Sequence, residues 1–183
     1  ETLPQATVAV IHMDGIDALF TSSDVDSSRK FLTSLIRIAD EAARANDLER
    51  VKVSGASYFA VSGMGTPYLD HAPRSVKFVA EAIGAMSAAA EQAGVELRAS
   101  GGVSSGMVTA GLVGDSRLVF DLWGDPVDEA AKLARLSPAD SIYISAGAQN
   151  RLPGGTELAQ VALPGDETAW SIRAEAVIPE VAP

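Results

Sequence analysis

The sequence predicts an α+β fold: a ferredoxin-like, mostly antiparallel sheet with helices on one face, followed by a C-terminal hairpin. Three observations lead to this prediction. The 183 residues suit one domain, 47% of them are hydrophobic, and strand-like segments alternate with segments of helical period. The order strand, helix, hairpin, helix, hairpin is typical of an antiparallel sheet covered by helices. We therefore expect a single domain over residues 1–173 and a loose tail over residues 174–183.

Strands are predicted where runs rich in Val, Ile and alternating apolar residues lie between Gly, Asp, Asn or Pro. The first of these is buried and ends at Asp14, and the turn at Gly55-Ala56 closes the first hairpin. The predicted strands cover residues 6–13, 49–54, 57–62, 95–104, 107–113, 117–123, 141–145, 157–163 and 168–172.

Helices are predicted where apolar residues recur every three or four positions. Asp26 or Ser27 is expected to cap the first helix, Asp70 to cap the second, and Gly94 to end the second. The predicted helices cover residues 27–46, 71–93 and 125–136.

Composition excludes several classes of protein. The formal net charge of −10 argues against a nucleic-acid partner, and the absence of cysteine excludes a disulfide scaffold or a thiolate metal site. No apolar run reaches the roughly 18 residues of a membrane span, so we expect no membrane contact by this fragment. The chain begins at Glu1 without a signal segment, and we expect a domain of a longer, cytoplasmic protein. A membrane-tethered parent is compatible with that location.

Common catalytic signatures are missing from the sequence, which has no phosphate-binding glycine loop and no nucleophile elbow. It contains two histidines. His12 falls within an apolar strand and is interpreted as a core or interface residue. His71 follows the start of a helix and is expected to be solvated.

Three segments carry the functional signal together. The first is VAVIHMDGIDAL at residues 8–19, and the second is LERVKVSGASYFAVSG at residues 48–63. The third, residues 97–136, combines the spacing Gly106…Ala110-Gly111…Gly114 with the later pattern D-x-W-G-x-x-V that begins at Asp121.

These segments, in this order, resemble the catalytic domain of class III nucleotidyl cyclases over about residues 6–173. The resemblance implies a sheet with helices on it and a head-to-tail homodimer whose active site lies between the subunits. It also implies conversion of a nucleoside triphosphate into a 3′,5′-cyclic monophosphate and pyrophosphate. Two metal ions assist such a reaction by activating the hydroxyl and neutralising phosphate charge.

The metal positions of the family are only partly matched. Asp14 corresponds to the first metal-binding Asp, whereas Ala56 stands at the second, and a methyl group offers no oxygen ligand. Asp17 places a carboxylate in the turn that would face the phosphates, where it is either repulsive or a substitute ligand. We expect one weak Mg²⁺ or Mn²⁺ site at most.

The purine-selecting positions of the family are matched. Lys52 corresponds to its adenine-contacting Lys, and Asp121 corresponds to the Asp that accepts a hydrogen bond from the adenine amino group. Without the resemblance, Lys52 would be interpreted as a solvated strand residue and Asp121 as a turn residue.

The positions that stabilise the transition state are altered. Asp128 replaces the ribose-positioning Asn of the family, and Lys132 replaces its phosphate-supporting Arg. The last hairpin carries Pro164-Gly165-Asp166-Glu167 where many members have a phosphate-binding Lys.

Two functional hypotheses follow. The favoured one is a catalytically inactive or very weak adenylate cyclase-like domain that binds ATP or another nucleotide and acts as a dimeric regulatory module. The alternative is a low-turnover, manganese-dependent adenylate cyclase. A vestigial cleft in a domain kept only for dimerisation is a third, minor hypothesis.

Overall fold

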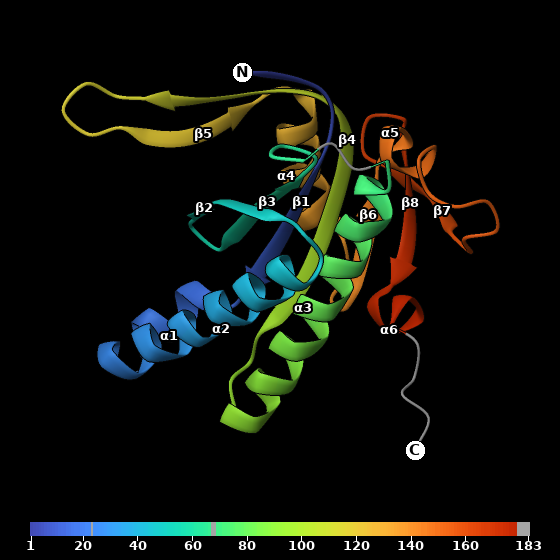
Figure 1. The fold of residues 1–183 in the computed structure, drawn as a ribbon. Helices are drawn as coiled ribbons and strands as arrows, with labels where there is room; N and C mark the ends of the chain where they lie inside the picture. Colours follow the sequence, from blue (N-terminus) through green and yellow to red (C-terminus); the bar gives the residue numbers. More distant parts are fainter. Residues whose placement is uncertain (23, 67–68, 179–183) are drawn as a thin grey trace.

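A computed structural model describes residues 1–22, 24–66 and 69–178 and confirms the α+β class (Figure 1). The strands are β1 (Thr2–Asp14), β2 (Glu49–Ser54), β3 (Ser57–Ser62), β4 (Arg98–Val113), β5 (Val119–Trp123), β6 (Ser141–Ile144), β7 (Ala159–Leu163) and β8 (Glu167–Arg173). The helices are α1 (Ile16–Ser22), α2 (Val25–Ala45), α3 (His71–Ala93), α4 (Asp125–Leu136), α5 (Ala146–Gln149) and α6 (Ala174–Val177).

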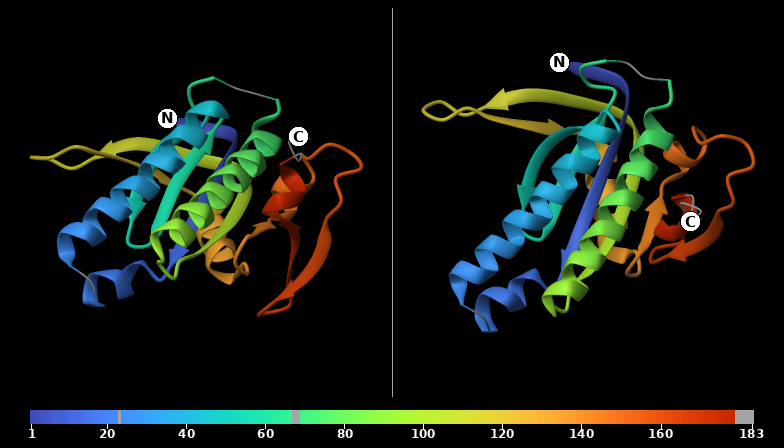
Figure 2. Two further views of the ribbon diagram at one scale, coloured as in Figure 1. Left: turned by 90° about the horizontal axis from the view of Figure 1, so that it is seen from below. Right: turned by 60° about the horizontal axis from the view of Figure 1, so that its bottom comes forward.

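The strands form one eight-stranded sheet in the order β2-β3-β1-β4-β6-β8-β7, and β5 pairs with β4 beside this path. The β4–β6 pair is parallel, and the other pairs are antiparallel. The sheet is therefore mostly antiparallel, as predicted. The hairpin of β4 and β5 extends away from the body of the molecule (Figures 1 and 2).

Successive side chains of β1 face opposite sides of the sheet, and each side has its own core. Ile11 and Met13 lie in the cluster that includes buried residues of α2 and α3. Val8 and Val10 lie in a second cluster with apolar residues of α4. The prediction of helices on one face thus holds for α2 and α3, which lie side by side (Figure 2), whereas α4 packs on the opposite face.

Two glycines of β4 explain how α4 approaches the sheet so closely. A Cβ atom at Gly102 would lie 2.1 Å from the carbonyl oxygen of Ala130, and one at Gly106 would lie 2.9 Å from Cγ of Pro126. Any side chain at Gly102 would push the helix away. Gly102, together with Gly106 of the motif, therefore fixes the position of α4, the helix that carries Asp128 and Lys132.

The structure corrects three details of the predicted elements. The two strands expected over 95–104 and 107–113 are one continuous strand, β4, because Gly106 stays in the ladder opposite Ala6. The only irregularity in the pairing of β1 with β4 among the described residues is a register shift in β1, between Leu3 and Ala6. The short helix α1 was not predicted, and the cap of α2 is Asp24, whose carboxylate accepts from the Ser27 N–H at 3.0 Å.

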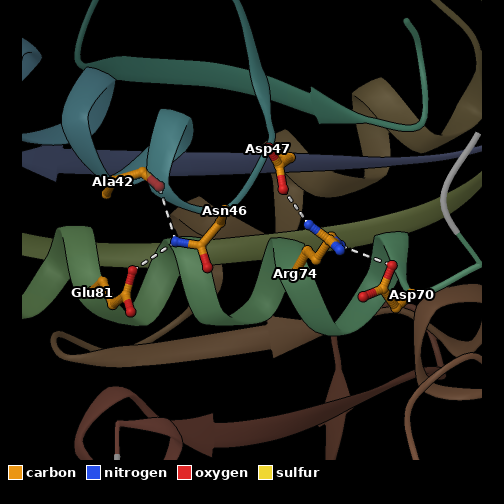
Figure 3. Close-up of polar contacts among 6 residues, drawn as sticks. All are labelled: Ala42, Asn46, Asp47, Asp70, Arg74 and Glu81. Atoms are coloured by element: carbon orange, nitrogen blue, oxygen red, sulfur yellow. Dashed lines mark hydrogen bonds and ion pairs between the residues drawn. The ribbon is translucent and has the colours of Figure 1, made fainter. Parts of the chain in front are cut away.

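Polar contacts tie the end of α2 to α3 (Figure 3). The buried Asn46 donates from Nδ2 to Glu81 Oε2 at 2.6 Å. Arg74 pairs with Asp47 and also places Nε 2.8 Å from Asp70 Oδ1. Asp70 ends the connection before α3 but makes no side-chain cap to the helix, since its carboxylate faces Arg74 instead.

The expected loose tail begins in the structure with the helix α6. Its first residue, Ala174, is buried and donates its N–H to the Asp140 carbonyl at 2.9 Å. Val177 and Ile178 pack against the core cluster on the α3 side. The remainder of the tail, residues 179–183, lies outside the described residues, and the single-domain boundary at residue 173 stays a prediction.

Candidate functional site

Lys52 and Asp121, the two positions predicted to select the purine, are in direct contact. Lys52 lies on the edge strand β2 and Asp121 on β5, and the Nζ atom is 2.7 and 2.9 Å from the two carboxylate oxygens. The two side chains are 33% and 26% exposed, so the pair is open to a ligand. Nζ also lies 5.3 Å from the ring centroid of Phe59, which adds a cation–π contact.

Asp121 is held in its charged form. Partial burial acts to raise the pKa of this carboxyl, but hydrogen bonds from Lys52 Nζ and from the Leu122 N–H, with the Lys52 charge, lower the pKa below its usual range. The Leu122 N–H donates to Oδ1 at 2.8 Å. The carboxylate of Asp121 is consequently held in one orientation, in which it can accept hydrogen bonds.

Asp14 and Ala56, the two metal positions of the resemblance, are neighbours in the structure. Asp14 is the exposed last residue of β1, and the N–H of the preceding Met13 donates to the Ala56 carbonyl at 2.8 Å. The two positions thus lie next to each other, but the second presents a methyl group. Asp17 is exposed in the first turn of α1.

These residues do not fit a preformed two-metal site. Within residues 1–22, 24–66 and 69–178, no group of three or more His, Cys, Asp or Glu side chains is placed to hold a metal ion. Octahedral Mg²⁺ needs several oxygen ligands. Asp14 alone would leave most of them to phosphate and water.

The two histidines have different surroundings. His12 is half-buried, and its Nδ1 lies 3.2 Å from Ser57 Oγ. Burial lowers the pKa of His12, against the opposing charge of Asp14. His71, expected to be solvated, is only 4% exposed, because it starts α3 over the sheet with Nδ1 2.5 Å from Thr7 Oγ1. The prediction for His71 was wrong, since its position at a helix start gave no signal of the strand beneath it.

Asp128 and Lys132 share one face of α4, one turn apart. Asp128 is exposed, and Lys132 is partly buried. The ammonium of Lys132 is bound by the carboxylate of Glu167, the first residue of β8. The sequence shows that the turn at residues 164–167 has no lysine, but it gave no indication of this ion pair.

The site residues form two groups on the sheet. Lys52 is opposite Phe59, which is opposite Val10, four positions before Asp14 on β1. Four residues along a strand and two strands across correspond to roughly 15 Å. Within one chain, the Lys52–Asp121 pair, called the purine pair below, therefore lies far from Asp14.

A cavity of about 410 Å³ lies elsewhere, among mostly apolar residues of α3, α6, β8 and the segment before β7. None of the predicted site residues lines it. The candidate functional site is consequently the open face of the sheet and α4, not this cavity.

The chain is similar to known proteins over most of its length. The family model of the adenylate and guanylate cyclase catalytic domain matches residues 1–168. An adenylate cyclase of Mycobacterium tuberculosis (strain ATCC 25618 / H37Rv) is 31% identical over 123 residues, which are 67% of this chain and 28% of that protein.

Solved structures show the same fold. The guanylate cyclase domain of RhGC from Catenaria anguillulae, in complex with GTP, has a TM-score of 0.83 and 23% identity, covering 93% of this chain and 96% of that one. The catalytic core of a rhodopsin-guanylyl cyclase with converted specificity, in complex with ATPαS, has a TM-score of 0.83 and 25% identity, covering 94% and 97%.

The chain belongs to the class III adenylate and guanylate cyclase catalytic domain family. It matches only 28% of the length of its mycobacterial relative. Among the described residues, no helix is both long and apolar enough to cross a bilayer.

Proposed function

We propose that this domain binds adenine nucleotides, has little or no cyclase activity, and serves as a dimeric regulatory module of a larger signalling protein. One contrast supports the proposal. The purine end of the site is complete, with Lys52 bound to Asp121. The metal and phosphate end has Ala56 in place of a carboxylate, and its Lys132 is paired with the carboxylate of Glu167.

The purine end favours adenine over guanine. A charged Asp121 accepts a hydrogen bond from the exocyclic amino group of adenine and repels the carbonyl oxygen that guanine has at that position. Lys52 keeps the carboxylate ionised and adds a donor for a ring nitrogen. A site built from such hydrogen-bonding groups discriminates strongly against a ligand that leaves them unpaired.

The phosphate end lacks most of what cyclisation requires. Ala56 supplies no metal ligand, and Asp128 presents acceptor oxygens where an amide donor would orient the ribose. Lys132 keeps a charge but is neutralised by Glu167. Electrostatic stabilisation usually contributes most to the rate enhancement of such reactions, and removing a single donor costs roughly 10²–10³ in rate.

The β4–β5 hairpin supports assembly into a head-to-tail homodimer. This projecting arm carries exposed apolar side chains, and such patches mark interaction surfaces. They are Met107, Leu112, Val113, Leu118, Val119 and Trp123. The Lys52–Asp121 pair and Asp14 are roughly 15 Å apart in one chain. A nucleotide bound between two protomers would therefore contact Lys52 and Asp121 of one protomer through its purine and face Asp14 of the other.

The alternative is a slow, manganese-dependent adenylate cyclase with one metal ion. Asp14 is exposed at the end of β1, and Asp17, also exposed, follows three residues later in the first turn of α1. Together with phosphate oxygens and water, this pair offers the ligands for a single Mn²⁺. A cytoplasmic location would supply the ATP for either function.

The deciding experiment is formation of cyclic AMP from ATP with Mn²⁺ at high protein concentration, beside an Asp14→Ala control. We expect no product above the control. Product that disappears in Asp14→Ala would contradict the inactive domain and establish the slow cyclase. ATP binding, measured on the same samples, separates an inactive binding domain from a vestigial cleft.

A further inference from the structure

The ion pair between Lys132 and Glu167 joins α4 to the first residue of β8, 35 positions later in the chain. Lys132 lies on the same face of α4 as Asp128, at the end of the site assigned above to phosphate. Its side chain is 39% exposed and that of Glu167 is 56% exposed. The contact is therefore at the surface, where a ligand can reach it.

We propose that Glu167 is an internal competitor of phosphate: its carboxylate takes the place of a ligand phosphate on Lys132 until a nucleotide displaces it. This inference rests on the proposed function, because it assigns Lys132 to the phosphate end of that site. It adds a regulatory contact that weakens binding of the triphosphate without affecting the purine.

The hairpin holds Glu167 in position. Leu163 pairs with Glu167 across β7 and β8, and Asp166 in the turn has a φ of +59°, a conformation that fixes a tight connection. The carboxylate is thus presented from an ordered strand rather than a free loop. Lys132, with its long side chain on a helix pinned by Gly102, is the adjustable partner.

Charge explains the effect on ligands. Both lysines of the site are matched by carboxylates of the same chain, Lys52 by Asp121 and Lys132 by Glu167. The purine pair suits a neutral base, but a triphosphate meets a lysine whose charge is already compensated. An exposed ion pair is weak enough to be exchanged, so Glu167 would tune affinity instead of abolishing it.

The test compares binding of three probes to the full 183-residue chain by calorimetry, without added metal: sodium tripolyphosphate, ATP and adenosine. Removing the Glu167 charge in Glu167→Gln should tighten tripolyphosphate and ATP by about two- to fivefold, the range of one exposed ion pair. Adenosine has no phosphate, and its affinity should not change. Glu167→Ala should reproduce the gain.

Two further variants make the test specific. Glu157→Gln removes an exposed carboxylate that forms no ion pair among the described residues, and it should leave all three affinities unchanged. Lys132→Gln should cancel the gain, so that the Lys132→Gln, Glu167→Gln double variant binds tripolyphosphate like Lys132→Gln alone.

The proposal is overturned if Glu167→Gln gives no gain, if Glu157→Gln gives the same gain, or if the gain persists without Lys132. Adenosine reports separately on the proposed function: binding that Lys52→Ala does not weaken would remove the purine assignment. Tripolyphosphate needs no purine contact, so it still reports on Glu167 in that event.

Discussion

Lys52 and Asp121 are 69 residues apart in sequence, and their side chains meet with Nζ 2.7 and 2.9 Å from both carboxylate oxygens. The contact joins the edge strand β2 to the projecting strand β5. It fixes the orientation of both groups before any ligand binds. A preorganised pair spends less of its binding energy on ordering side chains.

Lys52→Ala is expected to weaken ATP binding by about tenfold or more, the usual effect of losing a hydrogen bond to a charged group. Fluorescence titration with ATP and GTP would measure it. Lys30→Ala, an exposed lysine of α2, is the matched control and should bind like the wild type. Equal affinities for ATP and GTP in the wild-type chain would contradict the adenine assignment.

Ala56→Asp alone should give little cyclic AMP. The new carboxylate would complete the metal positions beside Asp14, but Asp128 would still replace the amide donor at the ribose and Glu167 would still compensate the charge of Lys132. The measurement is the initial rate with ATP and Mn²⁺. A steep rise in rate from this one substitution would show that the missing metal ligand was the only defect, and the inactive-domain proposal would fail.

Charges on the β4–β5 hairpin should break the proposed homodimer. Leu112 and Leu118 are 63% and 61% exposed, so replacing both by Asp leaves the core intact while making the arm polar. Sedimentation velocity should then show a monomer. Val25→Asp, at a 62% exposed position of α2, is the control and should leave the dimer unchanged. A dimer that survives the double substitution would place the interface elsewhere.

Asn46→Ala should lower the free energy of unfolding by about 1–3 kcal/mol, because it removes the hydrogen bonds of a buried amide to the Ala42 carbonyl and to the charged Glu81. Asn46 is 4% exposed and bridges the end of α2 to Glu81 (Figure 3). Urea unfolding would measure the loss. Arg37→Ala removes only an exposed pair with Glu41 and should cost about 0.5 kcal/mol or less. Equal effects of the two variants would mean that the α2–α3 contact contributes little.

His71 should make the fold less stable in mild acid. Burial, followed by the nearby charge of Arg151, lowers the pKa of His71 in the folded chain, although Asp70 opposes this. The unfolded chain then binds the extra proton, with a pKa of about 6.5. Stability is therefore full above that value and is lost as the pH falls from it towards the folded pKa.

His71→Gln should remove that part of the pH dependence. Urea unfolding at pH 7.5 and 5.5 would show a smaller difference for His71→Gln than for the wild type. Thr7→Val, which deletes the hydroxyl beside Nδ1 but keeps the buried ring, should retain the dependence. An unchanged difference in His71→Gln would show that other groups control it.

Sequence reasoning predicted much of the fold because it depends on local periods. The first hairpin, α3 up to Gly94 and α4 all have the expected type and nearly the expected limits, and the strand before Asp14 has the expected type but begins at Thr2 instead of residue 6. It failed for β4, where two strands were predicted on either side of residues 105–106, but both of these residues are held in the ladder by β1. A local pattern gives no information about the partner strand.

The sequence was sufficient to give the family, the α+β class and the chemical identity of the site residues. The family follows from the spacing of motifs along the chain. The site residues are read directly, because Lys52, Asp121 and Asp14 are present and position 56 has no Asp. Only the tertiary structure decided that α4 lies on the face opposite α2 and α3, that His71 is buried, and that Glu167 binds Lys132. These features depend on the packing of segments far apart in sequence. Their free energies are set by burial and by distances between charges, and neither quantity exists until the sheet has formed.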